Sequence, residues 1–256
     1  MRRRSESVAR RNREVLARIR ELKSDHPFWG YRRVWAHLRY VDDMLVNKKR
    51  VYRLMREHNL TVRPNQRLKA KRSSGRSKPV ASRPNQWWGI DMTKVMTDSG
   101  WTYIVIVLDW YSKKVVGHYA GIQAKSCHWL EALDMAVNRQ FPEGVRDHDL
   151  HLMSDNGSQP TSVSFMRACS NLDIHQAFTS YNNPRGNADT ERMMRTLKEE
   201  LLWLREWSSA DHIRRALNEW IEKYNRSYLH SALGYRSPNQ AEEAYKIGHK
   251  TLLKSA

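Results

Sequence analysis

Three acidic residues have types and spacing suited to metal-dependent phosphoryl chemistry. Asp91 lies inside an apolar, strand-like run, Asp155 follows a short apolar run, and Glu191 opens a long helical pattern. Thirty-five residues separate Asp155 from Glu191. Carboxylates of this kind can hold two divalent cations, which activate a nucleophile and stabilise the leaving oxygen of a phosphodiester. Oxygen ligands without paired Cys or His favour Mg²⁺ over zinc, with Mn²⁺ as an alternative.

Each acid alone also has an ordinary explanation. A charge in a strand is tolerated when the strand is at an edge or the side chain faces solvent, which would account for Asp91. The pair Asn156-Gly157 after Asp155 is typical of a simple turn. Glu191 is one of several acids on its helix and could form a surface pair with Arg195 at i+4. The site hypothesis therefore depends on the three acids meeting in space.

Helical geometry adds two cations to this hypothesis. At 100° per residue, Glu191, Arg195 and Lys198 share one face of their helix. The apolar residues of the same segment cluster on another face: Met193, Leu197, Leu201 and Leu204. We expect Arg195 and Lys198 to hold the DNA backbone beside the carboxylates.

The positive charge of the chain is confined to its first third. The formal net charge is +18, and residues 1–86 carry 25 Lys and Arg against 7 Asp and Glu, which accounts for all of it. Such density favours a polyanionic partner, and nucleic acid is the commonest one. We expect no membrane partner, because the chain has neither a spanning apolar segment nor a secretory signal. A cytoplasmic protein is therefore expected.

The basic third contains a candidate helix-turn-helix unit. Residues 1–25 are expected to form a separate basic helix or tail, and residues 26–62 to form two amphipathic helices. Asn47 is a suitable N-cap for the second of these helices. Its basic residues are candidates for DNA binding: Lys48, Lys49, Arg50 and Arg53. An ordinary helical pair with a basic surface is the alternative explanation.

The remaining segments divide the chain further. Residues 63–86 carry eight basic residues and almost no large apolar side chains, so we expect a flexible linker. Residues 87–245 are expected to form the catalytic core and residues 246–256 a C-terminal tail. Cys127 and Cys169 lack CxxC spacing, and we expect both to be small buried hydrophobic residues.

The pattern of the core predicts an α/β fold. Strands are expected at 87–95, 101–108 and 113–120, then a helix at 126–140, a strand ending at Met153, a helix at 161–171, a strand at 174–179 and two long helices. Three meandering strands beside two reached through helical crossovers make a mixed five-stranded sheet with helices on both faces.

The three acids and several motifs around them resemble a known family. Asp91, Asp155 and Glu191 resemble the Asp-Asp-35-Glu core of retroviral integrases and of transposases of the insertion-sequence-three family. The motifs are similar to those of that family's second reading-frame product: His26-Pro27-Phe28-Trp29-Gly30-Tyr31-Arg32, Pro84-Asn85-Gln86-Trp87-Trp88-Gly89-Ile90-Asp91-Met92-Thr93, Ser154-Asp155-Asn156-Gly157-Ser158-Gln159, Leu197-Lys198-Glu199-Glu200, Tyr224-Asn225-Arg226-Ser227-Tyr228-Leu229-His230 and Ser237-Pro238.

The resemblance implies a ribonuclease-H-like core preceded by an all-α helix-turn-helix unit. It implies Mg²⁺-dependent cleavage at transposon ends, followed by strand transfer to target DNA. Asp91, Asp155 and Glu191 would be both catalytic residues and ligands of two metal ions. The implied partners are DNA, the upstream reading-frame product or a fusion with it, and further copies of the chain. Gly186-Asn187-Ala188 departs from the family's Asp-Asn-Ala, so a DNA contact there differs.

Two alternatives stay open at this point. One is a ribonuclease-H-like nuclease that only hydrolyses its substrate. The other is a catalytically inactive DNA-binding regulator derived from a transposase. The presence of all three acids favours an active enzyme.

Overall fold

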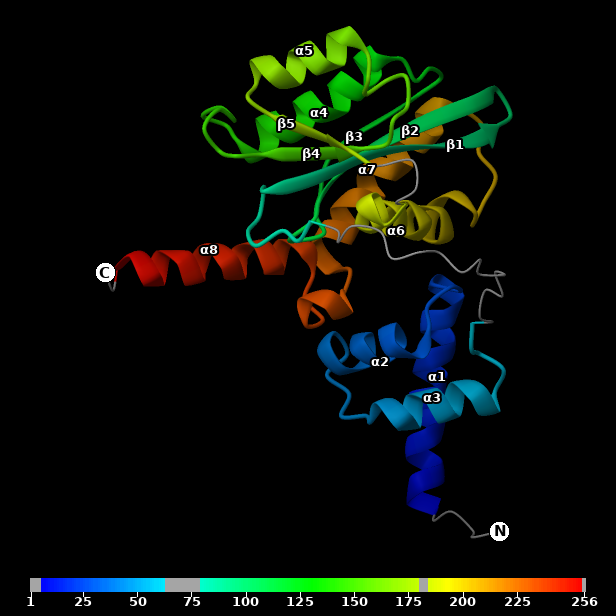
Figure 1. Ribbon diagram of the computed structural model, residues 1–256. Helices are drawn as coiled ribbons and strands as arrows, with labels where there is room; N and C mark the ends of the chain where they lie inside the picture. The colour runs from blue at the N-terminus through cyan, green and yellow to red at the C-terminus, as the bar shows by residue number, and fades with distance from the viewer. Residues whose placement is uncertain (1–5, 63–78, 180–183, 255–256) are drawn as a thin grey trace. The chain divides into compact units, whose positions relative to one another are not determined.

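The computed structural model describes residues 6–62, 79–179 and 184–254. The chain divides into two compact units, Met1–Arg72 and Ser73–Ala256, which are coloured blue to cyan and teal to red in Figure 1. Most of the expected linker, residues 63–78, lies outside the described residues. Within the described ranges, no helix is both long and apolar enough to cross a membrane.

The first unit contains three helices: α1 (Glu6–Asp25), α2 (Tyr31–Tyr40) and α3 (Lys48–Glu57). Asn47 caps α3 as expected, because its Oδ1 accepts a hydrogen bond from the backbone N–H of Lys49 at 2.8 Å. The three helices share one apolar core formed by Val15, Ile19, Leu22, Trp29, Val34, Leu38, Val46, Val51, Leu54 and Met55.

The first helix is part of this unit rather than a separate helix or tail. Its apolar stripe packs into the shared core, and two polar contacts tie it to the rest. Arg18 Nε donates to Asp42 Oδ2 at 2.8 Å, and Arg50 Nε donates to Asn12 Oδ1 at 2.9 Å. The expected boundary at residue 25 is therefore corrected, because the two helices after it need α1 to complete their core.

The second unit is built on a mixed sheet of five strands. β1 (Trp87–Thr97), β2 (Gly100–Asp109) and β3 (Val115–Gly121) form an antiparallel meander, and β4 (His151–Ser154) and β5 (His175–Phe178) run parallel to β1. The strand order is β3-β2-β1-β4-β5. This confirms the expected fold class and places β1 at the centre of the sheet.

Helices cover both faces of the sheet, as Figure 1 shows. α4 (Ser126–Gln140) and α5 (Val163–Asn171) pack on one face over the even-numbered residues of β1, such as Trp88 and Ile90. α6 (Ala188–Leu197) and α7 (Ala210–Ser227) pack on the other face, where Trp87 and Val95 contact the apolar core. Because side chains alternate along a strand, Gly89 and Asp91 point toward this second face.

A π-helical segment, η2 (Lys198–Leu202), continues α6. Met193, Leu197, Leu201 and Leu202 are buried, whereas Leu204, which lies beyond the end of this helical segment, is 42% exposed.

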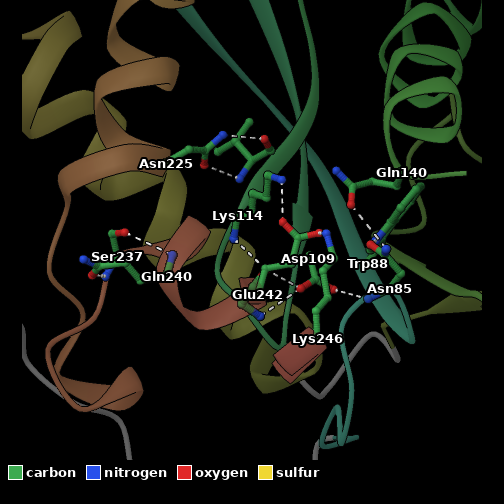
Figure 2. A network of polar contacts seen from close by, with 12 residues as sticks. Asn85, Trp88, Asp109, Lys114, Gln140, Asn225, Ser237, Gln240, Glu242 and Lys246 are labelled. Carbon is green, nitrogen blue, oxygen red and sulfur yellow. Dashed lines mark hydrogen bonds and ion pairs between the residues drawn. The ribbon is translucent and has the colours of Figure 1, made fainter. Parts of the chain in front are cut away.

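The last helix, α8 (Pro238–Lys254), includes residues 246–254, which were expected to be a tail. Glu242 anchors it to the sheet by accepting from Lys114 Nζ at 2.6 Å, as Figure 2 shows. Burial by itself would raise the pKa of Glu242, but Lys114 and Lys246 outweigh burial and hold that pKa below its usual value. Asp109, buried in the same region, accepts from the backbone N–H groups of Asn85 and Ser112.

The two cysteines differ in environment. Cys169 on α5 is buried, and burial raises the pKa of its thiol to about 12. Cys127 is exposed, which corrects the expectation that both are core residues. It is the second residue of α4 and lies on the side of the helix away from Trp129 and Leu133, which face the sheet.

Candidate active site

Asp91 lies on the central strand and is only partly exposed. Its strand pairs with β2 through Asp91 and Ile106, whereas pairing with β4 stops at Gly89. Asp91 Oδ1 accepts from the backbone N–H of Met92 at 2.8 Å. Asp91 is therefore not on an edge strand, so that explanation for a charged residue in a strand does not apply. On its β4 side, Asp91 lies beyond the last residue of β1 that pairs with β4.

Asp155 directly follows the carboxyl end of β4, which is where side chains that bind ligands commonly lie in α/β sheets. It is exposed, and its Oδ1 accepts from the backbone N–H of Gly157 at 3.0 Å. The residue therefore forms the turn that the sequence suggested, and it also holds its carboxylate at the sheet edge next to β1.

Glu191 is an exposed residue in the first turn of α6. The surface pair suggested for it does not form, because Arg195 Nε instead donates to Glu199 Oε1 at 2.7 Å. Thr190, immediately before Glu191, is fully buried against the sheet. Glu191 therefore lies at the surface, while the residue before it anchors the start of α6 in the core.

Asp155 and Glu191 lie close enough to Asp91 to affect its pKa. Burial raises the pKa of Asp91 most, the Met92 backbone N–H lowers it, the charges of Asp155 and Glu191 raise it and the Lys198 ammonium lowers it, with a net value of about 6. Groups separated by 64 and 100 residues from Asp91 act on it only because the sheet order and α6 place them nearby.

The chemistry of this cluster fits a divalent cation. Asp91 and Asp155 each use Oδ1 for a backbone hydrogen bond, and in the described part of the chain Oδ2 of neither residue has a hydrogen-bond partner. Among those residues, no three His, Cys, Asp or Glu side chains already converge into a metal-binding group. A cation held between hard oxygen donors would offset both the burial of the Asp91 charge and its repulsion by Asp155 and Glu191, which together raise the pKa of Asp91.

The candidate DNA-binding residues of α3 differ in their surroundings. Lys49 is exposed, and Arg53 forms only a loose pair with Glu57 at 3.8 Å. The Lys48 ammonium lies 4.1 Å from the centre of the Trp35 ring. Arg50 instead reaches back to α1, and burial, together with the charges of Arg11 and Arg53, lowers its pKa. Arg50 therefore supports the helical core, whereas Lys49 is presented to solvent.

On the catalytic side, Lys198 and Arg195 also differ. Lys198 lies close enough to influence Asp91 electrostatically. Arg195 is exposed and paired with Glu199. Three residues that the sequence analysis did not single out lie beside the acids: Gly89, Trp110 and Thr190. Of these only Gly89 had a sequence signal, a glycine inside a strand two residues before an acid, which often marks the close approach of another segment.

Comparison with known proteins gives the class to which this fold and site belong. Family models described as Integrase core domain match residues 81–184 and 172–238, and a model described as HTH-like domain matches residues 10–67. One chain of a simian T-cell lymphotropic virus intasome in complex with PP2A regulatory subunit B56 gamma is similar in fold, with a TM-score of 0.51 and 15% identity. The match covers 88% of this chain and 74% of that chain.

Relatives identified by sequence indicate which type of integrase-like protein this chain resembles. The transposase InsD for insertion element IS2A/D/F/H/I/K of Escherichia coli is 28% identical over 236 residues, which is 89% of this chain and 77% of that protein. The transposase InsD for insertion element IS2-9 of Escherichia coli strain K12 is also 28% identical over 236 residues, with 89% and 76% covered. Over most of its length the chain is similar to insertion-element transposases, and an HTH-like domain precedes its integrase core domain.

Proposed function

We propose that Asp91, Asp155 and Glu191 form the catalytic centre of this transposase. The enzyme is a polynucleotidyl transferase that cleaves DNA and transfers the cleaved strand to new DNA. The observation that supports the assignment of the three residues is the influence of Asp155 and Glu191 on the partly buried carboxylate of Asp91. Neither the purely hydrolytic nuclease nor the inactive regulator is favoured over this function.

The same three carboxylates are the proposed ligands of the divalent cation on which the reaction depends. We infer Mg²⁺, bound as two ions, with Mn²⁺ as a substitute. When bound, the metal would activate the attacking water or 3′-hydroxyl and stabilise the leaving oxygen. The carboxylate of Asp91 is partly buried and poorly hydrated, so binding a cation would stabilise its charge. The carboxylate of Asp155 is oriented by the hydrogen bond that it accepts from the backbone N–H of Gly157.

The cations of the chain are proposed to bind the substrate. Lys198 would contact a phosphate beside the carboxylates, with Arg195 next to it on the same helical segment. Lys48, Lys49 and Arg53 on α3 would hold DNA in the first unit. We further propose that transposon ends and target DNA are brought together by copies of this chain with an upstream reading-frame product or fusion. A cytoplasmic, nucleoid-associated location stays a prediction.

Strand transfer with pre-cleaved transposon ends tests the catalytic assignment. Asp155→Asn and Glu191→Gln should each abolish cleavage and joining, while DNA binding remains within a few-fold of wild type. Asp173→Asn is a matched control, because Asp173 is an exposed acid whose φ of 57° suits asparagine. Joining by Asp155→Asn at the wild-type rate would refute the assignment.

The same assay separates the alternatives. A transferase joins the supplied ends to target DNA in Mg²⁺, whereas a nuclease shortens them without producing joined DNA. An inactive regulator binds the ends and leaves them unchanged whether or not Mg²⁺ is present.

A further inference from the structure

At Gly89, β1 and the segments around the start of α6 leave no space for a side chain. A Cβ atom at this position would lie 1.9 Å from Thr190 Oγ1, 2.5 Å from Trp110 Nε1 and 2.8 Å from Asn187 Oδ1. Real Cβ atoms essentially never come within 3.0 Å of such neighbours. Any larger residue would therefore have to move α6, the segment before it, or the indole of Trp110.

These neighbours have little freedom to move. Thr190 is fully buried, and its β-branched side chain has few rotamers on a helix. Trp110 is 2% exposed, and its Nε1 donates to Thr190 Oγ1 at 3.1 Å. Rotation of the threonine would leave a buried indole N–H without this acceptor. A side chain at residue 89 would thus displace α6 rather than a flexible group.

A second contact fixes the same end of α6. Lys113 Nζ, in the turn between β2 and β3, lies 3.0 Å from Asp189 Oδ2, and both side chains are less than a quarter exposed. Trp110 and Lys113 both follow β2, so one short segment holds two successive residues of α6, Asp189 and Thr190. Glu191 is the next residue of the helix.

The contact between Gly89 and Thr190 lies next to two of the proposed catalytic acids. Gly89 and Asp91 are two residues apart on β1 and face the same side of the sheet. Thr190 and Glu191 are consecutive on α6. The distance at which the helix rests on Gly89 therefore determines how far the carboxylate of Glu191 stands from that of Asp91.

We propose that Gly89, Thr190 and Trp110 are positioning residues that set the separation of Glu191 from Asp91. This inference rests on the proposed function of those two acids. Restoring ordinary contact between a Cβ at residue 89 and Thr190 Oγ1 requires a displacement of about 1.5 Å. A misplacement of about 1 Å can cost an enzyme a factor of about 100 in rate.

The decisive variant is Gly89→Ala in the full chain, compared with Gly117→Ala. Gly117 is a matched control because its Cβ would be equally crowded, 2.1 Å from the backbone oxygen of Ala132 on α4, but on the face of the sheet away from Glu191. Strand transfer with pre-cleaved ends and Mn²⁺ binding by titration calorimetry are the two readouts.

We expect Gly89→Ala to lose about 100-fold in strand transfer and to bind Mn²⁺ at least tenfold more weakly. Gly117→Ala should stay within a few-fold of wild type in both. Wild-type Mn²⁺ binding by Gly89→Ala, or equal losses in Gly117→Ala, would each overturn the proposal.

Two further variants keep the result interpretable. If circular dichroism shows that Gly89→Ala does not fold, Asp189→Asn tests the positioning of α6 without adding volume, because it weakens the contact with Lys113. Weaker Mn²⁺ binding by Asp189→Asn supports the proposal, and unchanged binding overturns it. Asp91→Asn separates the two hypotheses. If it retains strand transfer, the proposed catalytic centre is wrong. If it is inactive while Gly89→Ala is fully active, only the positioning role is wrong.

Discussion

Asp91 should reduce the stability of the metal-free protein, so that Asp91→Asn is more stable although inactive. Burial is the main reason that the pKa of Asp91 rises from 3.8 to about 6, with Asp155 and Glu191 adding to it. At pH 7.5 this rise corresponds to about 3 kcal/mol against the ionised form in the folded protein. After the cost of burying the amide, we expect a gain of about 2 kcal/mol, or about 4–8 °C in Tm for a unit of this size.

The sign of the pH dependence follows from the raised pKa. Between pH 4 and pH 6 the folded protein binds more protons at Asp91 than the unfolded chain, so this group lowers stability progressively as pH rises through that range. The advantage of Asp91→Asn should therefore be complete above about pH 6 and absent below about pH 4. Unfolding by urea in EDTA at pH 4.0, 5.0, 6.0 and 7.5 measures it.

Metal should reverse the order of stability. A cation held by Asp91, Asp155 and Glu191 binds only the folded wild type and stabilises it by about 2.7 kcal/mol at 100 times its Kd. Asp155→Asn is the control for lost repulsion, since Asp155 is exposed and its removal should stabilise much less. If Asp91→Asn is no more stable than wild type in EDTA at pH 7.5, the carboxylate is not a desolvated charge and the reasoning fails.

Two further predictions concern surface charges and helix anchoring. Lys49→Ala should weaken DNA binding and reduce the slope of log K against log salt by about 1. Arg50→Ala should mainly lower the Tm of the first unit, because Arg50 donates a hydrogen bond to Asn12. Equal salt slopes in the two variants would contradict this prediction. Glu242→Gln should destabilise the second unit by about 1–3 kcal/mol at pH 7, because it removes the buried negative charge that pairs with Lys114 and Lys246. Since the pKa of Glu242 is held low, that difference should shrink as pH falls below about 4.5, and a constant difference would exclude the ion pair as its cause.

Local patterns were sufficient to predict most elements of the second unit. The expected helix at 126–140 coincides with α4, and each of the five expected strands is present within a few residues. These segments could be predicted because alternation and helical periodicity are properties of neighbouring residues. Asn47 was identifiable as a helix cap for the same reason.

Features that depend on packing could not be predicted from these patterns. The helical segment ends in a π turn at Lys198–Leu202, so Leu204 lies beyond it and is exposed, and Cys127 faces solvent. α1 became part of the helical unit only because α2 and α3 leave an apolar face for it to cover. Each outcome depends on which face of an element finds a partner, and that information lies in residues distant in the sequence.

The proposed catalytic site shows the same division between what the sequence and what the tertiary structure determine. The sequence by itself supplied the three acids, their spacing and the basic first third, because these are chemical properties of the residues and of motifs around them. Only the tertiary structure decided that Asp91 is on the central strand, that Asp155 lies at the end of the next strand, and that α6 carries Glu191 to both. Close approach at Gly89 sets that arrangement, since contacts between distant segments depend on volume in three dimensions.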